Sequence, residues 1–237
     1  MRPPRSWFDM LPNDRLLAEM SLWSADLMNM EADLARLAPY TDIWHVDVAD
    51  GHFSPAMLLF PDQIAAARRL TDKPIHVHLM VQDEILMAQV DQFAEAGADL
   101  ISVHAENANW LEGLGHITTH GLKCGIVAQL DTEVAALAKM LPELDLITLL
   151  GTRIGVKGKG LDPAAPARLQ EARQLITHQA GGRRVLLAAD GGIREHTVPQ
   201  LYQAGAQTIV MGSLAFNADD LAARMAWVHA QSEVRHP

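Results

Sequence analysis

The chain contains little that would cross-link it covalently or hold it in a membrane. Cys124 is the one cysteine among 237 residues, so no internal disulfide can form, as is usual in a reducing compartment. No run of about 18 or more apolar residues is present, which argues against a membrane-spanning helix. The opening residues, MRPPRSW, lack the apolar core and cleavage site of a secretory signal. These absences together favour a cytoplasmic protein.

Basic residues are scarce relative to acidic ones. With 19 Lys and Arg against 29 Asp and Glu, the formal charge is −10, and such a surface does not attract nucleic acid or an anionic membrane. A few local donors can still bind a small anionic substrate. What the chain has in quantity is apolar residues, 49% against 20% charged, which predicts a well-buried globular protein.

Short β-rich apolar segments alternate along the chain with longer amphipathic ones. The segment Asp83–Ala96 is typical of the longer kind, because its apolar residues recur near a 3.6-residue period. The predicted strands are Leu17–Trp23, Ile43–Val48, Ile75–Val81, Leu100–His104, Cys124–Ala128, Leu146–Leu150, Val185–Ala189 and Thr208–Met211. Strands that alternate with helices pair in parallel. Eight such units in a chain of this length predict a single-domain α/β fold, the (β/α)8 TIM barrel.

The alternative is an open doubly wound sheet, but no Gly-x-Gly-x-x-Gly follows the first strand. We place the barrel over residues 16–237 and treat residues 1–15 as an N-terminal extension. The extension carries an apolar cluster made of Trp7, Phe8, Met10 and Leu11. We expect this cluster to cap the bottom of the barrel or, alternatively, to pack on a neighbouring subunit. Reactive groups of such a barrel are expected at the carboxyl ends of the strands.

Polar residues occur where three of the predicted strands end. His45 and Asp47 are two residues apart on one strand, so both face the barrel interior. His76 and His78 repeat this spacing on the next strand, and Asp190 follows the seventh. Burying such groups is costly without a partner, and a metal ion is one partner that would relieve the cost.

Each of these residues alone has an ordinary structural interpretation. A single inward histidine is more often a hydrogen-bonded core residue, and an Asp-Gly after a strand is more often a turn. The convergence of two histidines and two aspartates on one rim favours a divalent ion instead. This mixed nitrogen and oxygen set suits Zn²⁺ or another first-row ion rather than Ca²⁺. Spacing alone leaves both interpretations open.

Four motifs follow one another in a recognisable order. Residues 45–55, HVDVADGHFSP, are similar to a pattern H-x-D-x-M-D-G-x-F-V-P. Residues 77–81 (VHLMV), 189–193 (ADGGI) and 21–26 (SLWSAD) are similar to V-H-L-M-V, V-D-G-G-I and S-I-L-S-A-D. These patterns are those of the ribulose-phosphate 3-epimerase family, which the chain resembles from about residue 21 to 216.

The resemblance implies a metal-dependent isomerase that epimerises ketose phosphates at C3 through an enediolate, with ribulose 5-phosphate and xylulose 5-phosphate as the family's pair. It implies that His45, Asp47, His78 and Asp190 hold the ion, with Zn²⁺ favoured and Fe²⁺, Mn²⁺ or Co²⁺ admitted by the ligands. Asp47 and Asp190 would also be the two acid/base groups, one on each face of the planar intermediate. Family relatives form dimers and larger assemblies, so a homo-oligomer is expected.

Further residues are expected to contact the phosphorylated ketose. They are Ser21, His52, Met80, Gly155, Gly158, Gly191, Gly192, Gly212 and Ser213. The glycines and Ser213 can offer backbone N–H groups to a phosphate at close approach. Ser21 and Met80 match family positions, whereas for His52 a solvated place on the rim is the alternative.

Three departures from the family bear on the substrate. Residues 153–159, RIGVKGK, replace N-P-G-F-G-G-Q and add three cations, either to close over a phosphate or as a solvated loop. Ala49 replaces a methionine, which opens space beside the ligands. His76 stands where Asp is common, either hydrogen-bonded to a ligand or, as we prefer, as a structural core histidine.

Other functions stay open at this point. The substrate can be another ketose phosphate, a tetrulose or hexulose phosphate, or the chain can be a non-catalytic sugar-phosphate-binding relative. The four intact ligand positions argue against the second. The related hexulose-phosphate synthase and orotidylate decarboxylase group relies on Asp-x-Lys-x-x-Asp, and residues 47–50, DVAD, contain no lysine. A Schiff-base aldolase would need a lysine inside the barrel, and the predicted strand interiors have none.

Overall fold

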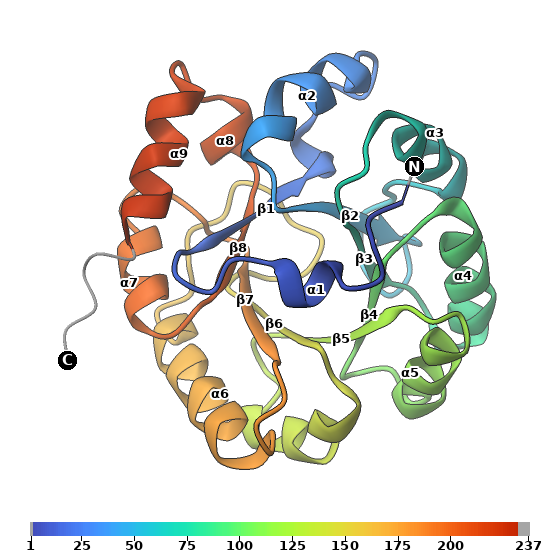
Figure 1. The fold of residues 1–237 in the computed structure, drawn as a ribbon. Helices are drawn as coiled ribbons and strands as arrows, with labels where there is room; N and C mark the ends of the chain where they lie inside the picture. The colour runs from blue at the N-terminus through green and yellow to red at the C-terminus, as the bar shows by residue number, and fades with distance from the viewer. Residues whose placement is uncertain (1, 232–237) are drawn as a thin grey trace.

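Eight parallel strands close into a barrel in the computed structural model, which describes residues 2–231 (Figure 1). Each strand pairs with the next along the chain, and the last returns to the first. The strands are β1 (Leu17–Ser21), β2 (Ile43–Ala49), β3 (Ile75–Met80), β4 (Leu100–His104), β5 (Lys123–Ala128), β6 (Leu146–Leu150), β7 (Leu186–Asp190) and β8 (Thr208–Met211). The predicted (β/α)8 barrel is confirmed.

Helices surround the barrel on the outside (Figure 1). The α-helices are α1 (Trp7–Met10), α2 (Met30–Leu37), α3 (Pro61–Leu70), α4 (Asp83–Ala96), α5 (Trp110–Thr119), α6 (Ala165–Gln179), α7 (Val198–Gln203), α8 (Ser213–Phe216) and α9 (Leu221–Ala230). Short 3-10 helices are η1 (Leu22–Ser24), η2 (Ala38–Tyr40), η3 (Val134–Lys139) and η4 (Leu141–Glu143). The helix predicted over Asp83–Ala96 has these same bounds. Within residues 2–231 no helix has the length and apolar character needed to cross a membrane.

Five of the eight predicted strands differ from the structure at their ends. β2 ends one residue later than predicted, β3 ends one residue earlier, and β5 begins one residue earlier. β1 stops at Ser21 rather than Trp23, because the chain turns at once into η1, where the Ala25 N–H donates to the Leu22 carbonyl. β7 begins and ends one residue later than predicted. Asp190 therefore belongs to the strand itself, and its side chain is positioned by strand geometry rather than by a loop.

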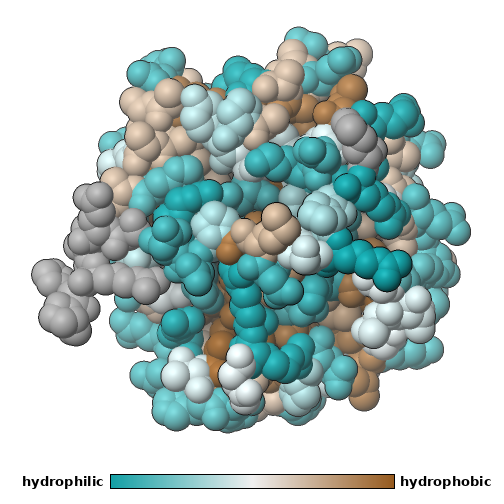
Figure 2. Space-filling view, in the orientation of Figure 1, coloured by the Kyte–Doolittle hydropathy of each residue, from teal (hydrophilic) through white to brown (hydrophobic). Residues whose placement is uncertain are grey.

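The N-terminal extension closes the bottom of the barrel. α1 lies across the near end in Figure 1, and Trp7 and Phe8 are buried there. They pack against Leu17, Ile43, Leu100, Leu146, Leu186 and Ala188, at or near the start of their strands. Figure 2 shows mainly hydrophilic residues over this end, so the apolar cluster lies underneath them. Capping of the barrel, the first of the two roles expected for this cluster, is what the structure shows.

Side chains inside the barrel change character from bottom to top. The lowest inward positions are the apolar ones that meet α1. Most of the next inward positions are polar and fully buried: Glu19, His45, His76, Ser102, Thr148 and Thr208. Above them, at the carboxyl end, come Ser21, Asp47, His78 and Asp190. Because inward residues alternate along each strand, one two-residue step separates each level from the next.

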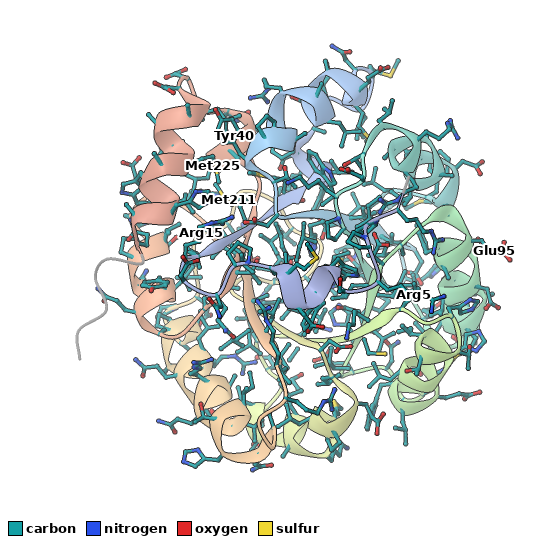
Figure 3. All side chains as sticks on the ribbon, viewed as in Figure 1. Arg5, Arg15, Tyr40, Glu95, Met211 and Met225 are labelled. Atoms are coloured by element: carbon teal, nitrogen blue, oxygen red, sulfur yellow. The ribbon has the colours of Figure 1, made fainter. Side chains whose placement is uncertain are left out.

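The main hydrophobic core lies between the barrel and the outer helices. Val46 and Val48 belong to it, as their alternation with the polar residues of β2 predicted. Met211 on β8 and Met225 on α9, both labelled in Figure 3, are buried in the same core. The polar interior of the barrel is therefore enclosed by an apolar shell, and its open side is the carboxyl end.

Candidate metal and substrate site

His45, Asp47, His78 and Asp190 converge at the carboxyl ends of β2, β3 and β7. One ligand atom from each lies within 4.8 Å of the others. Asp47 Oδ1 is 3.3 Å from His45 Nε2 and 3.4 Å from His78 Nδ1, and His78 Nδ1 is 3.8 Å from Asp190 Oδ2. Asp47 and His78 are direct neighbours in the β2–β3 register. The four residues predicted to meet are therefore brought together.

Two of these four atoms are buried and lack a hydrogen bond: His45 Nε2 and His78 Nδ1. Their rings are buried almost completely, at 0% and 1% exposure. A buried ring nitrogen without a partner costs free energy, so its presence calls for an explanation. Two imidazole nitrogens and two carboxylates around one point form a donor set that a first-row divalent cation satisfies. The residues present therefore fit a metal ion.

The other nitrogen of His78 fixes which form of the ring is present. His104 Nδ1 lies 2.8 Å from Glu106 Oε2, and the carboxylate accepts the Nδ1–H. Burial lowers the pKa of His104 to about 4 despite Glu106, so the ring is neutral and its Nε2 is an acceptor. His78 Nε2 lies 2.8 Å from that nitrogen and must donate to it. Nδ1 is thus the His78 nitrogen that faces the carboxylates and could coordinate an ion.

A second buried carboxylate does the same for His45. Glu19 Oε2 accepts from His45 Nδ1 at 3.0 Å and from His76 Nδ1 at 2.7 Å. His76 Nε2 in turn lies 2.7 Å from Ser102 Oγ, and Thr208 donates to the other Glu19 oxygen. Because Nδ1–H goes to Glu19, Nε2 is the His45 nitrogen that faces the carboxylates. Burial acts to lower the pKa of His45, but Asp47 and Glu19 outweigh it and raise that pKa well above its usual value, so an ion held there would displace a proton from Nε2. His76 is therefore a buried core histidine, the preferred of the two roles, and it bonds Glu19 and Ser102 rather than one of the four clustered residues.

The two aspartates of the cluster have different acidities. Burial raises the pKa of Asp190 to about 6, with Asp47 adding to the rise and His45 opposing it. Burial also acts to raise the pKa of Asp47, but His45 and His78 outweigh it and hold that pKa well below its usual range. Ser21 Oγ donates to Asp47 Oδ2 at 2.8 Å. Two carboxyl groups with pKa values pushed apart are typical of acid/base pairs.

A cavity of about 400 Å³ opens above this cluster. The predicted site residues that line it are Ser21, Asp47, His78, Met80, Gly155, Gly158, Asp190, Gly191, Gly192, Gly212 and Ser213. His45 lies beneath the floor and reaches the cluster through Nε2. His52 is exposed in the turn after Asp50 and lies outside the lining. The volume falls within the range that holds a small ligand.

The turn after β7 keeps the backbone close to this cavity. Gly191 and Gly192 have φ angles of 86° and 71°, a region that residues with a Cβ rarely adopt. A Cβ on Gly192 would also lie 2.7 Å from the Cα of Leu161. Glycine is needed at both positions for conformation and at Gly192 for space as well, and the backbone itself forms this part of the wall.

The loop over residues 153–159 lies across the mouth of the barrel, and every residue of it lines the cavity. Lys157 Nζ donates to the carbonyl of Trp23 and lies 4.8 Å from the centre of its indole ring. A Cβ on Gly155 would sit 2.1 Å from Ser54 Oγ, so this loop also packs tightly on the segment after β2. Arg194 brings a further cation to the wall. The loop thus borders the cavity, while Arg153, Lys157, Gly158 and Lys159 stay exposed to solvent.

Two glutamates of the site went unnoticed in the sequence. Glu19 stands alone in an apolar strand, two residues before Ser21, and its inward direction follows from the alternation along β1. That signal was available. Glu106 lies just beyond β4 in a turn, held by the Gln129 N–H at 3.0 Å, and no spacing rule points from it to His104.

The fold and the site define a (β/α)8 barrel with a polar cavity at its mouth that is large enough for a small ligand. A model of the Ribulose-phosphate 3 epimerase family matches residues 17–216. Ribulose-phosphate 3-epimerase 1 of Cupriavidus necator is 36% identical over 204 residues, 84% of each chain. The Bacillus subtilis enzyme is 33% identical over 180 residues, 76% of this chain and 82% of its own. The chain belongs to the ribulose-phosphate 3-epimerase family and is a sugar-phosphate epimerase, an isomerase.

Solved structures of other barrels share the fold at low identity. 3-Hexulose-6-phosphate synthase superposes with a TM-score of 0.64 at 17% identity, over 92% of this chain and 99% of its own. Orotidine 5′-phosphate decarboxylase from Pyrococcus horikoshii gives a TM-score of 0.65 at 14% identity, over 92% and 100%. At such identities the likeness shows the fold alone.

Proposed function

We propose that the chain is a metal-dependent epimerase that inverts C3 of a ketose phosphate. In this proposal His45, Asp47, His78 and Asp190 hold one divalent ion, and Asp47 and Asp190 exchange the C3 proton. The observation that carries it is the pair of buried, unpartnered ring nitrogens directed at two carboxylates. Zn²⁺ is the ion that the donor set suits best, with Fe²⁺, Mn²⁺ and Co²⁺ as alternatives.

A bound ion would supply polarisation of the ketose carbonyl and would stabilise the negative charge that develops on its oxygen. The protein's own carboxylates would move the proton. Asp47 is ionised and oriented by Ser21, which suits a base. Asp190, with its pKa raised to about 6, can hold a proton and return it near neutral pH. The two come from strands that are not neighbours, β2 and β7, so they can act on opposite faces of the enediolate.

The phosphate is proposed to bind at the wall formed by Gly191, Gly192, Gly212 and Ser213. Small residues let backbone N–H groups approach an anion closely there. Lys157 and Arg194 supply positive charge at the same cavity. The loop that carries Lys157 contributes every one of its residues to the cavity wall, so its charges lie beside a bound phosphate. Met80 and Ser21 would contact the sugar.

The test combines metal analysis with isotope exchange. Purified protein is expected to carry about one divalent ion per active site, and a chelator should remove activity that added Zn²⁺ or Mn²⁺ restores. In ²H₂O, wild type is expected to introduce deuterium at C3 of the ketose phosphate, and Asp190→Asn should not. Wild-type exchange in Asp190→Asn would exclude the two-carboxylate scheme. Metal binding without exchange on any sugar would indicate a binding protein instead.

The identity of the ketose is a separate question. Ala49 puts a small side chain next to Met80 in the β2–β3 register, and the 153–159 loop lines the cavity with three cations. These features favour a substrate shape other than that of ribulose 5-phosphate as the second candidate. Direct assay of tetrulose, pentulose and hexulose phosphates distinguishes the two. A clear preference in kcat/KM for ribulose 5-phosphate would refute the altered-substrate hypothesis.

A further inference from the structure

Three potential metal-binding side chains meet on the outer surface of the barrel, away from the mouth. Asp91 comes from α4, His116 from the last turn of α5, and His120 follows the end of α5. Asp91 Oδ1 lies 2.7 Å from Nε2 of His116 and 2.7 Å from Nε2 of His120. One ligand atom from each residue lies within 4.8 Å of the other two. All three thus converge on one point.

The fold determines this convergence. His116 and His120 are four residues apart, so they lie on the same side of α5, with ring centroids 5.5 Å apart. α4 and α5 are neighbours in the outer ring and pack on each other, which brings Asp91 opposite the histidine pair (Figure 1). Outer helices run opposite to the strands, so the late positions of α4 and α5 lie toward the bottom of the barrel. The cluster is therefore remote from the catalytic cavity.

We propose that Asp91, His116 and His120 bind a borderline divalent cation such as Zn²⁺, Ni²⁺ or Cu²⁺. Two imidazole nitrogens and one carboxylate form a set that such ions prefer over Mg²⁺ or Ca²⁺. Tetrahedral ligands at about 2.0–2.1 Å from an ion lie about 3.3 Å apart, so small side-chain movements suffice. Solvent water completes the coordination, because the two histidine side chains are 33% and 30% exposed and the Asp91 side chain 47%.

The proton balance of binding is simple. Without an ion, each neutral histidine donates its Nε2–H to Asp91. On binding, that proton moves to Nδ1 through solvent, and the Nε2 lone pair coordinates the metal, so a neutral ring releases no net proton. The position at the carboxyl end of α5 also favours a cation, because the helix dipole is negative there. Glu95, one turn beyond Asp91 on α4, adds negative charge nearby (Figure 3).

Titration of chelator-stripped protein with Zn²⁺ tests the site. Wild type is expected to bind one ion more than each of Asp91→Asn, His116→Gln and His120→Gln, or to bind it at least tenfold more tightly. Turnover of the sugar phosphate should stay within twofold in all three variants. Zn²⁺ should raise the thermal midpoint of wild type by a further increment that the variants lack, because the ion joins α4 to α5. His178→Gln, which removes an exposed histidine from α6, should bind as wild type does.

The proposal does not depend on metal at the barrel mouth. If the mouth binds an ion, wild type takes two and the surface variants one; if it does not, wild type takes one and the variants none. Equal stoichiometry and affinity in wild type and all three surface variants would overturn the surface site. Circular dichroism of the variants confirms that each is folded before it is titrated.

Discussion

The two ends of the barrel interior are made from the same strands but differ in chemistry. At the bottom, Leu17, Ile43 and Leu186 meet Phe8 in an apolar cluster. Two inward steps higher on the same three strands stand Ser21, Asp47 and Asp190. The bottom gains free energy from burying apolar surface. The top places charged groups where their burial is costly, and the network below it offsets part of that cost.

The bottom of the barrel therefore contributes mainly to stability, and the top mainly to function. Changes at the bottom should lower the free energy of unfolding and leave catalysis per folded molecule intact. Changes at the top should impair catalysis without lowering the free energy of unfolding, as expected where a site is built at the expense of stability. The polar middle level, centred on Glu19, connects the two because it is buried like a core and bonded to His45, a proposed metal ligand.

The largest effect is expected for Asp190→Asn. We expect kcat to fall by about 10⁴-fold, because the variant loses the proposed acid/base group, which is also a proposed metal ligand. The thermal midpoint of the metal-free protein at pH 7.5 should not fall. Burial raises the pKa of Asp190 to about 6 in the folded state, so its ionised form opposes folding above that pH, and Asn removes the opposition. Steady-state kinetics measures kcat, and calorimetry measures the thermal midpoint. A lower thermal midpoint of the metal-free variant would contradict the division between a stabilising bottom and a functional top.

Phe8→Ala tests the other end. Phe8 is 2% exposed, and its loss leaves a cavity beneath α1 that should cost about 3 kcal/mol of unfolding free energy. Arg184 also binds the Phe8 carbonyl at 3.0 Å, and this backbone contact should survive. Denaturant unfolding measures the loss, and kcat/KM of the folded variant should match wild type. Met10→Ala, on the same helix at 68% exposure, is the matched control and should change neither quantity.

The sequence predicts the strands and the four clustered side chains, but it does not predict the residues that orient those side chains. Alternation of apolar and polar residues was enough to place His45 and Asp47 inside and Val46 outside, because a parallel barrel strand has two distinct faces. Motif order then identified His78 and Asp190. Glu106, which orients His104 and through it His78, was not predicted. It reaches His104 from a turn, and the two-residue period of a strand does not encode turn geometry.

Loops account for the other differences. Residues 153–159 were expected either to close over a phosphate or to be solvated, and spacing could not decide between these. The structure shows contacts distant in sequence that hold the loop beside the cavity, Lys157 with Trp23 and Gly155 with Ser54, and closure over a phosphate stays a prediction. His52 lies off the cavity for a related reason. The Asp50 carboxylate accepts the His52 N–H at 2.8 Å in a local turn that leaves the ring exposed on the rim.

The middle level yields the third prediction. Glu19→Gln and Glu106→Gln should each weaken metal binding by about 10- to 100-fold. The first removes the negative charge that is bonded to His45, and the second removes the negative charge that acts on His78 through His104. Glutamine keeps the shape and can still accept from Nδ1–H, so the fold should persist. Competition with a chromophoric chelator measures the affinity. Glu112→Gln, an exposed glutamate in the first turn of α5, is the control and should bind as wild type does. Unchanged affinity in both network variants would mean that the carboxylates only fill space.

The smallest effect is expected at the rim, for Lys157→Met. Its ammonium contacts Trp23 and lies near enough to Asp47 for their charges to interact, so it contributes to closure of the loop and to the positive potential at the cavity. Methionine keeps much of the length and apolar bulk but removes the charge. We expect KM for the ketose phosphate to rise about fivefold, close to 1 kcal/mol, with kcat within twofold, because the group binds substrate and transition state alike. The KM increase should shrink at high salt, which screens an exposed cation. A fall in kcat without a change in KM would instead place Lys157 among the groups that act on the reacting carbon, and the division between rim and catalytic level would have to be redrawn.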